Sequence, residues 1–378
     1  MKKTIITVFA VLFCTFQISY SQTVSTLVPG PSTFDDCLTL DGDGNIYASR
    51  YVGTTITKIT PAGMTSIFAS GLSTPNGTAF GPDGYLYVPN NVNAGRIDRI
   101  SPGGVVDTFI TSIQYPTTVY FESDTSMLIC SYQLNRIYRA NISGSYSILY
   151  TGNGMNGPVD MDRDTDGNLL VANFTDGKIF RVDSAGTFNQ IADLPGTLGF
   201  MVVANGYIYT TALQVNKIFR TSMNGDTVTF AGTGGAGQVN GPVSSATFNG
   251  PNGIAVTTTG DTLYVSDFNT RSLRMITGVT SGIININSSA PEGFDLKQNY
   301  PNPFNPSTKI EFSIPQKGFT SLKVFDSLGK EIETLVNKTL SRGTYAATFN
   351  GSSHSSGVYF VRLQSNGIVI TSKMMLIK

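Results

Sequence analysis

Residues 250–277 read GPNGIAVTTTGDTLYVSDFNTRSLRMIT, and this stretch decides the fold. A Pro-Asn-Gly start is followed by an apolar run, a polar turn, the apolar pair Leu263-Tyr264 and then a basic residue, Arg274. Turn-forming residues stand at each break, and the runs between them are rich in residues that favour strands. The stretch therefore predicts short antiparallel strands joined by tight turns.

The same sequence pattern occurs six times between residues 34 and 277, with a period near 40 residues. The apolar pairs are Ile46-Tyr47, Leu86-Tyr87, Leu128-Ile129, Leu169-Leu170, Ile208-Tyr209 and Leu263-Tyr264. A period of this length, with four short strands per unit, is typical of a radial β-propeller. We predict an all-β chain in which residues 22–281 form a six-bladed β-propeller.

A closed ring needs a strand from the other end of the chain, because an open ring would leave two unpaired edges. Residues 23–28 resemble the outer strand that ends each copy, and we expect them to complete the sixth blade. A Gly-rich insertion, Gly232 to Gly250, lengthens the spacing before the last copy. We expect this insertion to form a loop at one face of the propeller.

A basic residue stands at the same place in every copy, on the third strand. With acidic groups in excess, this position favours pairing at blade edges or between blades over a basic binding ring. The six residues are Lys58, Arg99, Arg139, Arg181, Arg220 and Arg274.

Charge and the amino terminus narrow the class of protein. Residues 22–290 carry 13 basic and 19 acidic side chains, which argues against nucleic acid as a partner, because phosphate binding needs a basic footprint. Residues 1–21 read as a secretory signal peptide, with Lys2 and Lys3 before an apolar run. No other stretch has the roughly 20 apolar residues that span a bilayer, so we expect no transmembrane segment in the mature chain.

Cys37 and Cys130 fall on different blades, and we predict two separate buried thiols.

The last copy carries a family resemblance. Ala231-Gly232-Thr233-Gly234, Pro251-Asn252-Gly253-Ile254-Ala255-Val256 and Leu263-Tyr264-Val265-Ser266-Asp267 together resemble an NHL repeat. The senescence-marker (SMP-30)/gluconolactonase-like propellers are similar, and both families are six-bladed. The resemblance covers about residues 23 to 285 and implies a propeller scaffold.

The carboxy-terminal part has a different pattern. After a polar linker at residues 282–297, four prolines between residues 301 and 315 precede alternating strands, which fit a small, Ig-like β-sandwich over residues 298–378. The opening Tyr-Pro-Asn-Pro-Phe-Asn-Pro and the later Ser-Ser-Gly-Val-Tyr-Phe-Val-Arg-Leu closely resemble the type A sorting domain of the type IX secretion system. That resemblance implies that residues 298–378 contact the secretion machinery. It places the protein outside a Gram-negative cell or on its outer membrane, with the domain commonly removed there. An ordinary adhesive sandwich is the alternative.

Catalytic candidates are few. The only histidine, His354, lies outside the propeller, which excludes a histidine-dependent hydrolase there. The start of each innermost strand faces the axis of a propeller, and the aligned residues are Asp36, Asn76, Thr118, Asp160 or its neighbour, Leu198 and Asn252. Four of these carry oxygen donors that suit Ca²⁺.

The resemblance to gluconolactonase-like enzymes gives these axis residues a possible role. That family surrounds its metal with one Glu, two Asn and one Asp. Asn76, Asp160 and Asn252 match the Asn and Asp roles, and Asp35 or Asp36 stands where the family has Glu. The alternative is structural, since Pro-Asn-Gly also simply starts a strand.

A second metal candidate lies in one turn. Asp162, Asp164 and Asp166 followed by Gly167 match the first half of an EF-hand-type Ca²⁺ loop, although position twelve is Asn173 instead of Glu. A solvated hairpin turn like residues 41–45 is the alternative. The leading functional hypothesis is a non-catalytic surface propeller that binds a protein, peptide or glycan, and the alternative is a Ca²⁺-dependent lactonase-like hydrolase.

Overall fold

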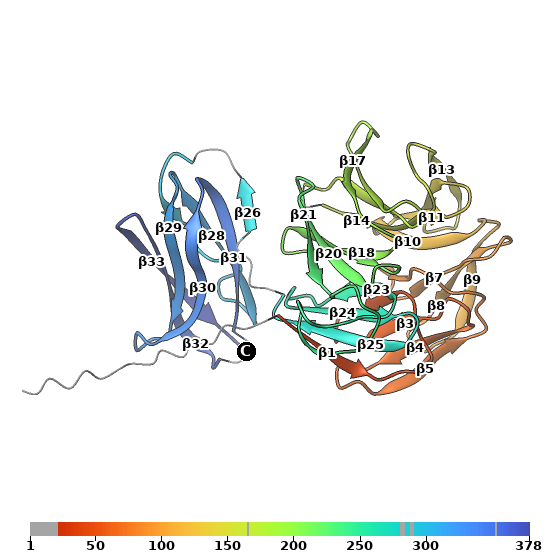
Figure 1. Ribbon diagram of the computed structural model, residues 1–378, viewed down its shortest axis with the longest axis horizontal. Helices are drawn as coiled ribbons and strands as arrows, with labels where there is room; N and C mark the ends of the chain where they lie inside the picture. The colour runs from red at the N-terminus through yellow and green to blue at the C-terminus, as the bar shows by residue number, and fades with distance from the viewer. Residues whose placement is uncertain (1–21, 165, 280–283, 288–290, 352–353) are drawn as a thin grey trace, which may run out of the picture.

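The computed structural model describes residues 22–378 apart from 165, 280–283, 288–290 and 352–353. Every regular element among these residues is a β-strand, as the repeat predicts. The strands form two modules, a ring of sheets and a smaller sandwich, which Figure 1 shows side by side. No helix among the described residues has the length and apolar character needed to cross a bilayer.

Six antiparallel sheets form the blades of the propeller. The innermost strands are β2 (Leu38–Leu40), β6 (Ala79–Phe80), β10 (Pro116–Ser123), β14 (Pro158–Arg163), β18 (Leu198–Ala204) and β23 (Pro251–Val256). The second strands are β3 (Ile46–Ser49), β7 (Leu86–Asn90), β11 (Ser126–Ser131), β15 (Leu169–Asn173), β19 (Tyr207–Ala212) and β24 (Thr262–Asp267). The third strands are β4 (Thr55–Ile59), β8 (Arg96–Ile100), β12 (Arg136–Asn141), β16 (Lys178–Val182), β20 (Lys217–Ser222) and β25 (Ser272–Thr277). The outer strands of the first five blades are β5 (Thr65–Ser70), β9 (Val106–Thr111), β13 (Tyr146–Thr151), β17 (Phe188–Asp193) and β21 (Thr227–Ala231).

The amino-terminal strand closes the ring. β1 (Thr23–Val28) pairs antiparallel with β25, with Thr23 opposite Thr277 and Thr26 opposite Arg274. Val24 is fully buried in the joint. The predicted closure is confirmed.

The Gly-rich insertion, which we expected to be a loop at one face, also pairs with the closing strand. It contributes β22 (Gly241–Pro242), which pairs with the outer edge of β1, and the amide of Val243 donates to the carbonyl of Gln22 at 3.0 Å. The last sheet therefore has five strands, in the order β22-β1-β25-β24-β23. The physical reason is that a terminal strand leaves one edge unpaired, and the insertion covers it.

The apolar pairs of the repeat form the core between blades. The second strands are almost completely buried, and Ile46, Leu86 and Leu170 have no exposed surface. Each sheet packs its apolar faces against its neighbours, so burial is shared around the ring. This packing holds the loops at both ends of the strands in fixed positions.

The aligned basic residues are structural, as interpreted from the sequence. Arg139 pairs with Glu122 at 2.7 Å, Arg181 pairs with Asp164 at 2.7 Å, and Arg220 lies over the ring of Tyr207 at 4.5 Å. The remaining three also form ion pairs within their own blades: Lys58 with Asp41, Arg99 with Asp107 and Arg274 with Asp267. Cys37 and Cys130 are buried free thiols, which confirms the prediction for both.

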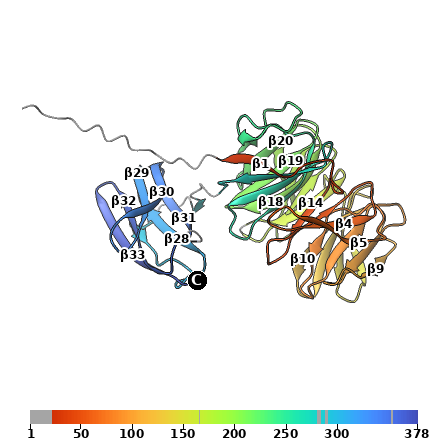
Figure 2. The ribbon, with the colours of Figure 1, turned by 90° about the horizontal axis from the view of Figure 1, so that it is seen from below.

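The carboxy-terminal module is a sandwich of two four-stranded sheets. Their orders are β26-β31-β28-β27 and β30-β29-β32-β33. The strands are β26 (Ile284–Asn287), β27 (Asp295–Leu296), β28 (Ser307–Ile314), β29 (Gly318–Phe325), β30 (Glu331–Leu340), β31 (Gly343–Asn350), β32 (Gly357–Ser365) and β33 (Ile368–Leu376). Figure 2 shows the two modules from a second direction.

One domain boundary differs from the prediction. β26 and β27 fall inside residues 282–297, which we predicted to be linker, yet both belong to the sandwich. β26 pairs with β31, with Ile284 opposite Ala346, and β27 pairs with β28, with Leu296 opposite Phe312. Because the edges of β31 and β28 would otherwise be unpaired, the short strands have partners that a local pattern does not reveal.

Candidate functional site

The predicted axis residues lie together at one end of the propeller. Asp36, Asn76, Thr118, Asp160, Leu198 and Asn252 all stand at or just before the inner strands, and each is at most 8% exposed. The loops that enter the inner strands lie at this end, as do the loops that join the second and third strands. We call this end the mouth face.

Asp36 is the least satisfied member of this ring. Its Oδ1 accepts a hydrogen bond of 2.6 Å from Asn252 Nδ2, which joins the last blade to the first. Its Oδ2 is buried without a hydrogen-bond partner of normal geometry, and so is the nearby Ser49 Oγ. Burial, and then the charge of Asp35, raise the pKa of Asp36 well above its usual range, although hydrogen bonds from the Asn252 side chain and the Cys37 amide oppose the shift.

Asp160 is held on both sides. Its Oδ1 accepts from Thr118 Oγ1 at 3.2 Å and its Oδ2 from the amide of Met201 at 2.9 Å, so it links three consecutive blades. Burial raises its pKa to about 7. The charge of Asp160 also contributes, after burial, to raising the pKa of the Cys37 and Cys130 thiols.

The Asn-Gly pairs of the repeat serve the ring itself. A Cβ on Gly253 would collide with the carbonyl oxygen of Asp36, and one on Gly77 would lie 2.6 Å from the carbonyl oxygen of Thr117. Neighbouring inner strands therefore approach as closely as glycine allows. This close approach supports the structural interpretation of Pro-Asn-Gly.

The axis tetrad is only partly assembled as a cation site. Asn252 is in direct contact with Asp36, whereas the oxygens of Asp160 are already taken and Asn76 Oδ1 accepts from the amide of Gly77 at 3.0 Å. Within the described ranges, no group of three or more His, Cys, Asp or Glu side chains could hold a metal ion. Among the fully buried side-chain oxygens of the tetrad, Asp36 Oδ2 has no hydrogen-bond partner of normal geometry.

The loop candidate is a turn in the structure. Asp164 Oδ1 accepts from the amides of Asp166 and Asn168 at 2.9 and 2.8 Å, while its Oδ2 pairs with Arg181. Asp162 points to the next blade, where its Oδ2 accepts from the amide of Val203 at 2.7 Å. Asp41 makes the same turn. The structure therefore does not gather Asp162, Asp164 and Asp166, because the carboxylates of Asp162 and Asp164 have separate structural partners and Asp166 is exposed.

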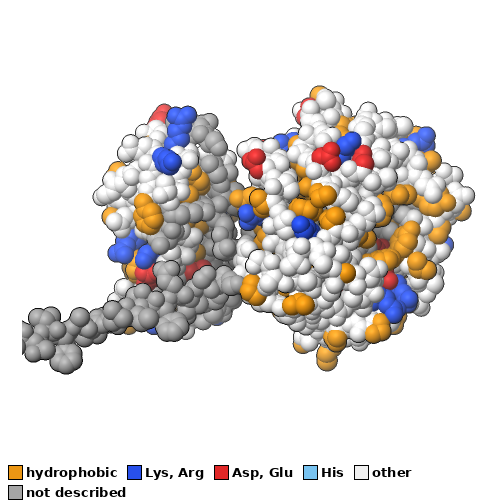
Figure 3. All heavy atoms as spheres, in the orientation of Figure 1, with side chains coloured by type: hydrophobic (Ala, Val, Ile, Leu, Met, Phe, Trp, Pro, Cys, Tyr) orange, Lys and Arg blue, Asp and Glu red, His pale blue; other side chains and the backbone are white. Residues whose placement is uncertain are grey.

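A set of aromatic side chains, which the sequence reasoning missed and which we call the collar, lies on loops at the mouth face. It consists of Tyr51, Tyr115, Tyr132, Phe174 and Phe268. The ring centroids of Tyr51 and Phe268 are 6.5 Å apart and those of Tyr132 and Phe174 are 5.9 Å apart. In Figure 3, hydrophobic side chains lie around the centre of the propeller, and an acidic side chain is visible between them.

Burial raises the pKa of Tyr51 first, and the charges of Asp36, Tyr132 and Tyr115 raise it further. The sequence signal was available, because Tyr132, Phe174 and Phe268 each follow the last residue of a second strand.

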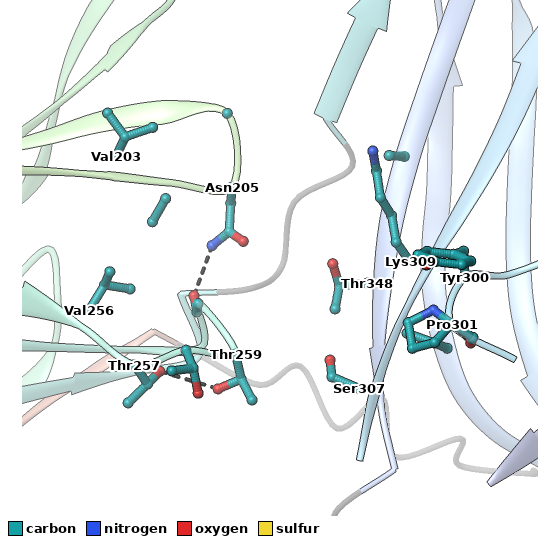
Figure 4. Close-up of a pocket in the computed structure, with 16 residues that line it drawn as sticks. Val203, Asn205, Val256, Thr257, Thr259, Tyr300, Pro301, Ser307, Lys309 and Thr348 are labelled. Carbon is teal, nitrogen blue, oxygen red and sulfur yellow. Dashed lines mark hydrogen bonds between the residues drawn. The ribbon is translucent and has the colours of Figure 1, made fainter. Parts of the chain in front are cut away.

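A groove of about 660 Å³ lies between the two modules, and Figure 4 shows its walls. One wall is the hairpin turns at residues 203–206 and 256–260, where Asn205 Nδ2 donates to the carbonyl of Gly260 at 2.8 Å. The other wall includes Tyr300 and Lys309 of the sandwich. Lys309 pairs with Glu311 at 2.8 Å. The turns of the first wall lie at the opposite end of their strands from the collar. The residues that line the groove include no acid–base pair.

The fold and the site define a class: a six-bladed propeller with an aromatic mouth, followed by a sorting sandwich. The family model of the virginiamycin B lyase family matches residues 18–231, and that of the secretion system C-terminal sorting domain matches residues 298–378. The chain belongs to the virginiamycin B lyase family, and its sorting domain indicates secretion or display at the cell surface. No curated protein matches the chain.

Solved structures support the fold. A virginiamycin B lyase from Staphylococcus aureus is 22% identical, with 66% of this chain and 82% of that chain covered and a TM-score of 0.50. A gluconolactonase from Xanthomonas campestris is 13% identical, covering 68% and 89%, with a TM-score of 0.54. An auxiliary nutrient binding protein from Bacteroides ovatus is 14% identical, covering 68% and 76%, with a TM-score of 0.59. The expected similarity to gluconolactonase-like propellers is confirmed for the fold, and the narrower NHL-repeat assignment stays a prediction.

Proposed function

We propose that this protein is a propeller, exported by a type IX secretion system, that binds an extracellular protein, peptide or glycan at its mouth face. The observation that carries the proposal is the collar, whose five aromatic side chains stand on loops at the same end of the propeller as the buried Asp36 carboxyl. Aromatic side chains around a few polar groups are typical of binding surfaces. The signal peptide proposed for residues 1–21 lies outside the described residues.

Binding is favoured over catalysis because the propeller lacks a histidine base and its Asp160 carboxyl already serves the scaffold. The propeller has no histidine, and both oxygens of Asp160 accept hydrogen bonds that join blades. A general base must reach the proton that it removes, and these groups serve the scaffold instead. The titratable groups of the mouth face therefore support a rigid binding surface.

The test is a screen of the full chain against glycan and peptide arrays. Tyr132→Ala and Phe174→Ala should each lose the binding that the wild-type chain shows, because both rings contribute to the collar. Tyr300→Ala is the matched control, since Tyr300 is 82% exposed on the other module. Binding that survives both collar substitutions would contradict the proposal.

A second candidate is a Ca²⁺-dependent lactonase-like hydrolase. It is favoured by the unpartnered Asp36 Oδ2 beside Asn252, on the same ring as Asn76 and Asp160. Ca²⁺ at millimolar concentration should then raise the melting temperature, and Asp36→Asn should abolish the increase. Hydrolysis of small lactones would be measured with and without chelator. An unchanged melt would remove both metal proposals, and a shift without hydrolysis would leave a structural ion.

A further inference from the structure

One face of the carboxy-terminal sandwich carries a hollow of about 380 Å³. It lies on the sheet β30-β29-β32-β33, beside the turn that joins β29 to β30. Val324, Val361 and Leu363 alternate with its strand residues and are fully buried in the core, so the hollow faces away from the core. The residues that line it are Phe325, residues 326–329, Phe360, Arg362 and Thr371.

Arg362 brings a positive charge to the hollow that the chain does not balance. Its guanidinium carbon lies 4.3 Å from the centroid of the Phe325 ring, and among the described residues it has no ion-pair or hydrogen-bond partner. Lys323 stands directly opposite Arg362 across β29 and β32, and like charges in such a pair are unfavourable. Glu331 already pairs with Lys323 at 2.9 Å. The arrangement therefore favours an anion from outside the chain.

The turn beside Arg362 presents an apolar side chain. Asp326 Oδ1 accepts hydrogen bonds from the amides of Leu328 and Lys330, each at 2.9 Å, so the one acidic side chain of the lining is engaged in fixing the turn. Leu328 stands at the tip of this turn and is 92% exposed. Together with the Phe325 and Phe360 rings it forms an apolar wall next to a guanidinium. Arg beside aromatic and apolar anchors is typical of protein–protein contact sites.

The charge of the whole module agrees with an acidic partner. Residues 291–378 carry 10 basic and 6 acidic side chains, whereas the propeller is acidic. Lys373 is exposed and stands opposite Phe360, on the same face as the hollow. Such a surface attracts an acidic partner and repels a basic one.

We propose that the sandwich docks on its export machinery through this hollow, which takes a carboxylate side chain flanked by an apolar residue on a protein of the outer membrane. The inference rests on the export part of the proposed function and does not involve the mouth face. A carboxylate matches the planar fork of Arg362, since two parallel N–H donors can bind its two oxygens. The apolar neighbour would pack against Leu328 and Phe360.

A protein partner suits the hollow better than a lipid headgroup. Anionic membranes are bound by clusters of several Lys and Arg side chains, whose attraction adds up across the surface. Here a single cation, Arg362, lines the hollow, and the rest of the lining is aromatic, apolar or neutral except for the engaged Asp326. One carboxylate with one apolar neighbour uses all of these features.

The first experiment measures export of the full chain in a bacterium that has a type IX secretion system. Arg362→Gln removes the charge of the hollow and Leu328→Ser removes its apolar tip. Each variant should accumulate in the periplasm with residues 298–378 attached, whereas the wild-type chain should reach the medium or the cell surface. Lys309→Gln is the matched control, since Lys309 is exposed on the other sheet and pairs with Glu311; its export should be unchanged.

Thermal melts separate docking from a structural role. Arg362→Gln loses the contact with Phe325 but also relieves the repulsion from Lys323, and these two effects oppose each other. The variant should therefore melt within about 3 °C of the wild-type chain. A much larger decrease would assign Arg362 to the stability of the sandwich and would overturn the inference for this residue.

A binding measurement tests the chemistry of the partner. Outer-membrane vesicles of the same bacterium are immobilised as the probe, and the purified full chain is applied in solution. The wild-type chain should bind at least about tenfold more tightly than Arg362→Gln or Leu328→Ser, the loss typical of a central interface residue. Amidation of the vesicle carboxylates with carbodiimide and glycinamide should weaken binding of the wild-type chain to the same extent. Liposomes of the extracted lipids should not distinguish the wild-type chain from Arg362→Gln.

Normal export of both variants would overturn the inference, and so would loss of export for Lys309→Gln. Vesicle binding that survives amidation would exclude a carboxylate, and Arg362-dependent binding to the liposomes would assign the hollow to a lipid headgroup. Both results would refute the proposal. Collar-dependent array binding together with normal export of the variants would leave the proposed function standing without this docking site. A wild-type chain that stays in the periplasm would refute the export part of both.

Discussion

Arg274→Met should destabilise the propeller more than any other single change to the aligned basic residues. The Arg274 side chain has no exposed surface, and its Nη1 lies 3.3 Å from Asp267 Oδ2. The guanidinium also holds the insertion, because Nη1 donates to the carbonyl of Thr247 at 2.8 Å and Nη2 to the carbonyl of Val239 at 3.1 Å and to Asn240 Oδ1 at 2.9 Å. One side chain therefore ties the sixth blade to the segment that covers the closing strand.

The magnitude follows from the burial of the pair. Removing one partner of a buried ion pair leaves an unpaired charge and costs about 3–5 kcal/mol of unfolding free energy. Burial outweighs the attraction of Arg274 and raises the pKa of Asp267 to about 6, so the pair is not strongly stabilising by itself. For a domain of this size each kcal/mol lowers the melting temperature by about 2–4 °C, so we expect a decrease on the order of 10 °C.

Thermal melts of three chains test the reasoning at pH 7.5. Arg274→Met should melt well below the wild-type chain, and the double variant Arg274→Met with Asp267→Leu should recover most of the loss, because an apolar pair replaces the ionic one without leaving a charge. Lys58→Met is the control, since Lys58 is half-exposed and lies 3.9 Å from Asp41. A decrease of less than about 2 °C for Arg274→Met, or a double variant no better than the single one, would refute the account.

Three further predictions concern the ring, the axis and export. Deleting residues 23–28 should lower the melting temperature sharply, because β25 loses its partner; an unchanged melt would contradict the closure. Asp160→Asn should be stabilising at neutral pH: the folded pKa of about 7 lies above the unfolded value of 3.8, so this group's contribution is most favourable below pH 3.8 and is lost as the pH rises to about 7. The advantage of the variant should thus grow from pH 4 to pH 7, to at most about 4 kcal/mol, and a constant difference would argue against the raised pKa. Mass spectrometry of the secreted protein should show a mass near that of residues 22–290, whereas retention of residues 298–378 would exclude removal of the sorting domain.

The fold could be predicted because its determinants are local and repeated. Turn residues and apolar pairs recur in every blade, and the rule that sheet edges need partners was enough to place residues 23–28 in the sixth blade. The same rule was not applied to β22, β26 and β27. These strands are two to four residues long, so only their distant partners identify them as strands.

The positions of the candidate site residues could be predicted from the sequence, but which of their oxygen atoms lack hydrogen-bond partners could not. Asp36, Asn76, Asp160 and Asn252 are buried at or just before the start of the inner strands, as the alignment of the copies predicts, and their role as a metal site stays a prediction. Which oxygen atoms remain free depends on bonds between blades, such as that from Met201 to Asp160, and no pattern within one copy contains this information. The collar was missed although Tyr132, Phe174 and Phe268 each follow a second strand, because its residues come from different blades and no single copy shows them together.

The way the ring closes also sets the order in which it can fold. Ser25 on β1 and Met275 on β25 face each other although they are 250 positions apart, whereas strands of the first five blades pair with neighbours along the chain. Joining two distant ends carries the largest loss of chain entropy in the molecule, and such non-local pairing is slow. A chain that appears from its amino terminus must keep β1 unpaired until β25 has followed. The sixth blade is therefore expected to be the last one completed, because its two closing strands lie at opposite ends of the propeller sequence.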